Sequence, residues 1–184
     1  MSFRALPNVI SIARMGLILP IVWALLTGQF KFALWLFLIA GISDALDGLL
    51  AKRFGWETSL GAILDPVADK LLLVGCFITL GWLGILPWWL VLTVFARDLI
   101  IVVWIVSHHY LLENVEVVPS VLSKINTFAQ IVCVLLVVYA AANQVAPVFI
   151  DMWIVITLLT TVFSGLQYLA IWSRRAAGLR QATR

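Results

Sequence analysis

Two acidic stretches stand in apolar surroundings: residues 43–53 read Ser-Asp-Ala-Leu-Asp-Gly-Leu-Leu-Ala-Lys-Arg, and residues 61–70 read Gly-Ala-Ile-Leu-Asp-Pro-Val-Ala-Asp-Lys. Asp44 and Asp47 are three positions apart, and Asp65 and Asp69 are four apart, so each pair lies on one face of its own helix. A carboxylate inside a membrane helix costs about 2.5 to 3.5 kcal/mol even on a lenient insertion scale. Four of them together therefore imply bound cations, a wet cavity, or both.

The composition around these stretches is that of an integral membrane protein. Of the 184 residues 64% are hydrophobic and 11% are charged, and the mean hydropathy is +1.10, which excludes an ordinary soluble domain. Apolar runs near the length of about 20 residues that spans a bilayer lie at 8–28, 31–50, 64–84, 87–108, 121–142 and 149–172. We therefore expect an all-α membrane protein of six transmembrane helices, forming one domain over residues 1–184.

Charge distribution predicts the orientation of these helices. Basic residues gather at the N-terminus, the second and fourth connections and the C-terminus: Arg4, Arg14, Lys52, Arg53, Lys124, Arg174, Arg175, Arg180 and Arg184. The other connections hold only Lys31, so both termini and the acidic stretches are expected on the cytoplasmic side. Arg14 inside the first run favours a retained helix over a cleaved signal sequence. The basic tail is expected to meet anionic lipid headgroups, and nothing indicates nucleic acid.

The acidic cluster is suited to hard divalent cations. Carboxylate oxygens favour Mg²⁺ or Mn²⁺, and Mg²⁺ is normally shared with the phosphates of a substrate. Two such ions can stabilise both the attacking and the leaving oxygen at phosphorus, so the cluster predicts two ions and phosphoryl-type chemistry. Structural alternatives exist for single residues: Asp65 before Pro66 is a good helix start, Asp44 suits a helix end, and Asp69 with Lys70 suits a solvated rim.

The spacing Asp44-x-x-Asp47-Gly48-x-x-Ala51 and Gly61-x-x-x-Asp65-x-x-x-Asp69 resembles the signature of the CDP-alcohol phosphatidyltransferase family. The segment Pro7, Asn8, Ser11 and Arg14 is similar to the entry segment of that family. Lys52 stands where the family usually has arginine, which keeps the charge but not the bidentate grip of arginine on phosphate.

The resemblance implies roles for these residues. Asp44, Asp47, Asp65 and Asp69 would hold the metal ions, and Asp69 would also be the general base. The CDP-linked lipid, CDP-diacylglycerol, would be bound by Asn8, Arg14, Gly48, Ala51, Lys52 and Gly61. It also implies the cytoplasmic membrane of a bacterium as the location, with a homodimer as one option.

The acceptor alcohol has to be read from the later helices. The strings Phe95-Ala-Arg-Asp and Ser123-Lys-Ile-Asn-Thr are similar to strings in CMP-forming cardiolipin synthases, whose acceptor is phosphatidylglycerol. Phosphatidylglycerophosphate synthases, which use glycerol 3-phosphate, are the alternative. A dianionic acceptor needs several cations, whereas Lys70, Arg97 and Lys124 are the available acceptor-binding candidates. The structural alternative is an ion pair of Arg97 with Asp98 and a snorkelling Lys124.

Two other classes of function remain open at this point. A divalent-cation transporter would also place acids inside a helical bundle, although the absence of an internal repeat and the clustering on one side argue against it. A membrane scaffold would tolerate replacement of all four aspartates. Cys76 and Cys133 fall within predicted spans and are expected to pack as small apolar residues rather than to form a disulfide.

Overall fold

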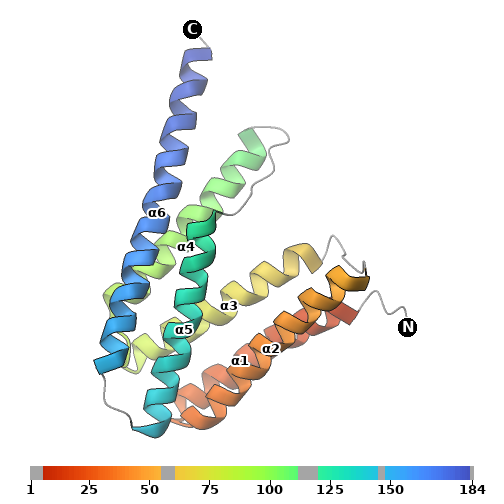
Figure 1. The fold of residues 1–184 in the computed structure, drawn as a ribbon, viewed down its shortest axis with the longest axis vertical. Helices are drawn as coiled ribbons and strands as arrows, with labels where there is room; N and C mark the ends of the chain where they lie inside the picture. Colours follow the sequence, from red (N-terminus) through yellow and green to blue (C-terminus); the bar gives the residue numbers. More distant parts are fainter. Residues whose placement is uncertain (1–5, 55–60, 112–119, 145–147, 183–184) are drawn as a thin grey trace. The chain divides into compact units, whose positions relative to one another are not determined.

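The computed structural model describes the backbone of residues 6–54, 61–111, 120–144 and 148–182, and side chains within 10–44, 67–103, 120–144 and 150–170 together with Leu46 and Arg53. Over these residues the chain forms six α-helices and no strand (Figure 1). The helices are α1 (Leu6–Leu26), α2 (Phe30–Phe54), α3 (Gly61–Trp82), α4 (Trp88–Leu111), α5 (Val121–Asn143) and α6 (Val148–Ala182).

The expectation of six helices is confirmed, and each predicted apolar run lies on one of them. α2 and α6 extend furthest past their runs, because backbone hydrogen bonding continues where the apolar sequence stops. Two described segments, Val121–Asn143 and Ile150–Ala170, are long and apolar enough to cross a membrane. The crossing of all six helices stays a prediction.

The chain divides into two compact units, and α5 contributes to both. Unit 1 comprises Met1–Leu86 and Val134–Pro147, and in it α1 packs against α2 and α3. Unit 2 comprises Pro87–Cys133 and Val148–Arg184, and in it α4 packs against α6.

A tight turn joins α1 to α2 in unit 1. Gly28 has a φ of 74°, and the backbone N–H groups of Gly28 and Gln29 donate to the carbonyls of Leu25 and Ala24. A glycine with a positive φ often ends a helix in this way, because the N–H groups that follow can donate to the last carbonyl groups of the helix. Because the turn reverses the chain, residues at similar distances before and after Gly28 come to the same level of the hairpin. Arg14 and Asp44 are such a pair.

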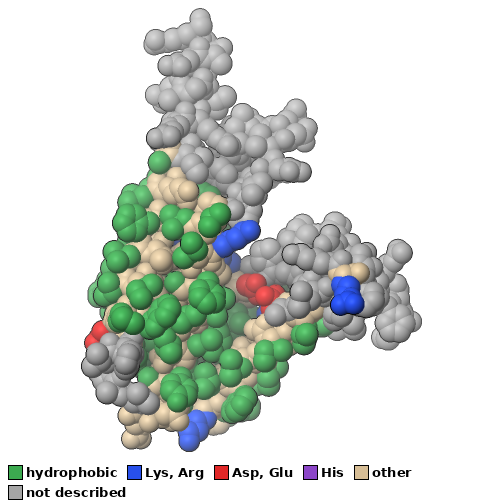
Figure 2. All heavy atoms as spheres, in the orientation of Figure 1, with side chains coloured by type: hydrophobic (Ala, Val, Ile, Leu, Met, Phe, Trp, Pro, Cys, Tyr) green, Lys and Arg blue, Asp and Glu red, His purple; other side chains and the backbone are tan. Residues whose placement is uncertain are grey.

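Large hydrophobic side chains remain exposed in both units. Leu19, Trp23 and Trp35 are examples in unit 1, and Leu92, Phe128 and Phe163 in unit 2. Figure 2 shows hydrophobic side chains covering most of the described surface over α5 and α6. Surfaces of this kind are normal where the surroundings are lipid and unusual where they are water. Cys76 and Cys133 are buried free thiols, as expected for packing residues.

Candidate active site

Arg14 joins two of the predicted metal ligands from different helices. Its Nη1 lies 2.6 Å from Oδ1 of Asp44 and 2.6 Å from Oδ1 of Asp69. Since both oxygens lie at that distance from one nitrogen, they can be separated by no more than twice that length. Carboxylates of α2 and α3 therefore converge on one point beside α1.

Each of the two aspartates ends a buried stripe on its helix. On α2, Ala33, Phe37, Ala40 and Asp44 follow one another at spacings of three or four, and the first three are buried. On α3, Asp69, Leu73, Cys76 and Leu80 do the same, and the last three are buried. Residues at these spacings share one helix face, so the faces that pack within unit 1 also aim the two carboxylates inward.

The exposure of the three charged groups differs in a way that matters for ligands. The Arg14 side chain is 1% exposed, whereas those of Asp44 and Asp69 are 40% and 41% exposed. A buried guanidinium needs partners, because an uncompensated buried charge costs about 3 to 5 kcal/mol. The two carboxylates supply that compensation and still present oxygen to the outside, where a cation or a substrate can reach them.

The donor set fits a divalent cation. Two carboxylate oxygens lie close together on side chains that are partly exposed, and carboxylate oxygens are ligands that Mg²⁺ and Mn²⁺ prefer. Asp47 lies inside α2 and Asp65 inside α3, but their side chains fall outside the described residues, as do those of Asn8, Gly48, Ala51, Lys52 and Gly61. No group of three or more potential ligands occurs among the side chains that are described.

Two structural alternatives for the aspartates are wrong. Asp65 does not start a helix, because α3 already begins at Gly61. Asp44 does not end one, because α2 continues to Phe54. Asp69 is half exposed, as a solvated rim requires, but it also contacts Arg14 of another helix.

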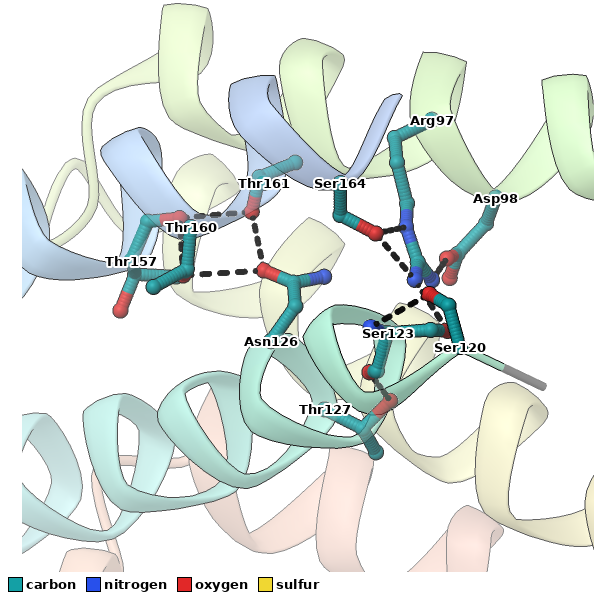
Figure 3. A network of polar contacts seen from close by, with 10 residues as sticks. All are labelled: Arg97, Asp98, Ser120, Ser123, Asn126, Thr127, Thr157, Thr160, Thr161 and Ser164. Carbon is teal, nitrogen blue, oxygen red and sulfur yellow. Dashed lines mark hydrogen bonds and ion pairs between the residues drawn. The ribbon is translucent and has the colours of Figure 1, made fainter. Parts of the chain in front are cut away.

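Arg97 is enclosed by polar partners in unit 2 (Figure 3). Its Nη1 donates to Oδ1 of Asp98 at 2.8 Å, and its Nε and Nη2 donate to Oγ of Ser164 at 3.2 and 2.8 Å. Nη2 also donates to Oγ of Ser123. The arginine of α4 thus connects α5 and α6, and the predicted ion pair with Asp98 is present.

The two lysines proposed for the acceptor are more accessible than Arg97. Lys124, near the start of α5, is exposed, and Lys70, next to Asp69 on α3, is partly exposed. Lys70 belongs to unit 1, whereas Arg97 and Lys124 belong to unit 2. Among these candidates the structure brings only Lys70 into the same unit as the acidic cluster.

Sequence reasoning missed the polar face of α6. Ser164 contacts Arg97, and the hydroxyls of Thr160 and Thr161 donate to Oδ1 of Asn126 at 3.0 and 2.8 Å (Figure 3). Thr157, Thr161 and Ser164 are fully buried. Their spacing of four and three along an apolar helix was the available signal, because it places all three hydroxyls on one face.

Comparison with known proteins finds relatives that are named for two different synthases. A protein named "Probable phosphatidylglycerophosphate synthase" from Mycobacterium tuberculosis is 32% identical over 96% of this chain and 85% of its own length. Proteins named "Cardiolipin synthase (CMP-forming)" are 38% identical over 56% of the chain in Streptomyces coelicolor and 30% identical over 78% in Homo sapiens. The chain spans about half the length of these two, covering 52% and 51% of them.

A family model settles what these relatives share. The model described as CDP-alcohol phosphatidyltransferase matches residues 4–172, which include both acidic stretches, Arg14 and the enclosed Arg97. Members of this family are membrane-bound enzymes of phospholipid synthesis that use a CDP-alcohol, an acceptor alcohol and divalent metal ions. The chain belongs to the CDP-alcohol phosphatidyltransferase family.

Proposed function

We propose that the protein transfers a phosphatidyl group from CDP-diacylglycerol to phosphatidylglycerol, giving cardiolipin and CMP. Family membership supports the donor side of this reaction. The observation that carries the choice of acceptor is the engagement of Arg97 by Asp98, Ser123 and Ser164.

Counting cations favours a lipid acceptor. Glycerol 3-phosphate brings a dianion, whereas phosphatidylglycerol has one phosphodiester charge. An arginine whose Nε, Nη1 and Nη2 already donate inside the protein has little left for a bidentate grip on phosphate. Lys70 and Lys124 are then the main candidates to meet the acceptor, with Arg97 holding the helix that bears Lys124. One or two lysines suffice for a monoanion.

The chemistry follows from the acidic cluster. Asp44, Asp47, Asp65 and Asp69 would hold two Mg²⁺ or Mn²⁺ ions, which supply charge stabilisation at the diphosphate. Asp69 takes the proton of the acceptor hydroxyl. The hydroxyl oxygen then forms a bond to the phosphorus that bears diacylglycerol, the bond from that phosphorus to the CMP oxygen breaks, and CMP leaves. Asn8, Arg14, Gly48, Ala51, Lys52 and Gly61 would bind the CDP part.

The membrane arrangement belongs to the same proposal. Six helices cross the cytoplasmic membrane of a bacterium, both termini are inside, and the acidic cluster faces the cytoplasmic surface. The donor and acceptor lipids keep their acyl chains in the bilayer and present their headgroups to the site. A CDP-alcohol family member has no need for a conduction path, so a divalent-cation transporter is the weaker hypothesis.

A second candidate is phosphatidylglycerophosphate synthesis from glycerol 3-phosphate. The observation in its favour is that the Mycobacterium tuberculosis relative named for that activity matches 96% of the chain. The cardiolipin synthase relatives match smaller shares, 56% and 78%.

One experiment separates the two candidates. Purified protein is incubated with CDP-diacylglycerol and Mg²⁺, and phosphatidylglycerol and glycerol 3-phosphate are supplied in separate reactions. We expect cardiolipin and CMP with phosphatidylglycerol only, detected as product masses. Phosphatidylglycerophosphate formed from glycerol 3-phosphate, without cardiolipin in the other reaction, would establish the second candidate. Omission of both acceptors is the control for hydrolysis of the donor.

A further inference from the structure

One nitrogen of Arg14 contacts carboxylate oxygens of two of the proposed metal ligands. Nη1 is 2.6 Å from Oδ1 of both Asp44 and Asp69. We propose that Arg14 is a displaceable counter-cation: it holds these two carboxylates together, and it gives up the space between them when a divalent ion binds. The inference rests on the metal site of the proposed function.

The charges of the three groups explain why such a counter-cation is needed. Asp44 and Asp69 bring two negative charges close together, and a positive group between them offsets the repulsion. Because α1 packs against both α2 and α3, the same contact also closes the three-helix arrangement of unit 1. Carboxylates of two helices can thus stay converged before a metal ion arrives.

A metal ion and the guanidinium cannot share this place. Mg²⁺ requires oxygen ligands at about 2.0 to 2.1 Å, in the space that Nη1 occupies at hydrogen-bonding distance. Two unit charges of one sign about 4 Å apart repel by about 4 kcal/mol at an effective dielectric constant near 20. An ion that binds between these two Oδ1 atoms therefore competes with the guanidinium for Asp44 and Asp69.

The released side chain has a defined new task. Arg14 is 1% exposed, so its guanidinium is confined to the interior beside the site. A planar guanidinium matches phosphate oxygens well, and the diphosphate of the CDP-linked lipid would arrive at this place. Arg14 would then exchange Asp44 and Asp69 for the diphosphate. In this order of events the ion binds first and the diphosphate second.

The test measures binding of Mn²⁺ alone, with no nucleotide, to the purified full-length protein by electron paramagnetic resonance. Arg14→Gln removes the competing charge, and we expect its Kd for Mn²⁺ to fall about tenfold or more. Arg14→Lys keeps the positive charge but has a shorter side chain and lacks the planar, forked donors of the guanidinium. We therefore expect its Kd for Mn²⁺ to fall by about threefold. Lys31→Gln removes an exposed charge at the other end of α2 and should match wild type.

The outcomes separate this inference from the proposed function. Unchanged or weaker Mn²⁺ binding in Arg14→Gln overturns the inference while the metal site stands. If Arg14→Gln does not fold, Arg14→Lys decides in the same way, since an unchanged or weaker affinity overturns the inference and a tighter one supports it. Failure of wild type to bind Mn²⁺ overturns the metal site of the proposed function, and the inference with it.

Discussion

Arg14 and Arg97 are both buried arginines, but their partners differ. Arg14 contacts two carboxylates that are 40% and 41% exposed. Arg97 contacts Asp98, whose side chain is 12% exposed, and two serine hydroxyls. Partners that reach the surface can exchange one cation for another, whereas enclosed partners cannot. We therefore propose that Arg14 belongs to the reacting site, whereas Arg97 connects α4 with α5 and α6.

The proposed base role of Asp69 gives a direct prediction. Asp69→Asn should lower turnover by about 100-fold or more, because the amide cannot accept the proton of the acceptor hydroxyl. Binding of CDP-diacylglycerol should remain measurable, since Asp44, Asp47 and Asp65 remain as the proposed metal ligands. Release of CMP is the measurement. Asp151→Asn, at an exposed position near the start of α6, is the control. Turnover near the wild-type rate in Asp69→Asn would remove Asp69 from this role.

Arg97→Gln should destabilise unit 2. The change removes the buried ion pair with Asp98 and the hydrogen bonds to the hydroxyls of Ser123 and Ser164, which we expect to cost about 3 to 5 kcal/mol. Thermal unfolding in detergent measures the effect. Lys124→Gln, an exposed change in the same unit, should stay within about 0.5 kcal/mol of wild type. Equal unfolding temperatures for the two variants would contradict the structural role of Arg97.

At the scale of helices, the functional side chains continue the packing faces. On α4, Leu90, Val94 and Arg97 are buried at spacings of four and three, just as Asp44 and Asp69 extend stripes on α2 and α3. The apolar part of each face is held by its neighbours and orients the polar residue at its end. Small residues allow this where helices approach closely: a Cβ added at Gly165 of α6 would lie 3.7 Å from Cγ of Arg97.

The contact at Gly165 predicts a size limit. Gly165→Ala should be tolerated, because its Cβ makes an ordinary van der Waals contact with the Arg97 stem. Gly165→Leu should destabilise by about 1 to 3 kcal/mol, because the longer side chain has to displace Arg97 or the backbone. Gly41→Leu is the matched control, since a Cβ there meets nothing within 4 Å. Thermal unfolding compares the three variants, and equal losses in both leucine variants would argue against a specific limit at Gly165.

At the scale of the molecule, unit 1 has two different ends. A surface pocket at one end is lined by Gly28–Phe32, from the α1–α2 turn and the start of α2, and by Ala141, Ala142 and Gln144 at the end of α5. The ion pairs of Arg14 lie about 20 Å further along α1, given 1.5 Å per residue. This separation is a large part of the thickness of the hydrocarbon core of a bilayer. The two ends therefore suit opposite membrane surfaces.

This arrangement predicts which positions can be labelled from outside the cell. In a background with Cys76 and Cys133 replaced by alanine, Gln29→Cys and Gln144→Cys should react with a membrane-impermeant maleimide in intact cells. Arg53→Cys, at the exposed end of α2 beyond Asp44, should react only after permeabilisation. Labelling of Arg53→Cys in intact cells would place the acidic end of unit 1 outside and contradict the proposed orientation.

Features that depend on residues close together in the sequence could be predicted from it, whereas features that depend on distant residues could not. Helix positions depend on local hydropathy, so all six were predicted, and the spacing of the four aspartates indicated the family. The C-terminal ends of α2 and α6 were not predicted, because helical hydrogen bonding continues beyond the last apolar residues. The two alternatives that placed Asp44 and Asp65 at helix ends failed for the same reason.

The sequence by itself determined the helical class, the membrane character and the identity of the acidic residues. Each of these depends on the amino-acid composition or on spacings of a few residues along the chain. Only the tertiary structure decided that one nitrogen of Arg14 meets both Asp44 and Asp69, and that Arg97 is enclosed by Asp98, Ser123 and Ser164. These contacts join residues 26 to 67 positions apart, apart from the neighbouring Asp98. Packing of helix faces brings them together, and no local pattern records which faces will meet.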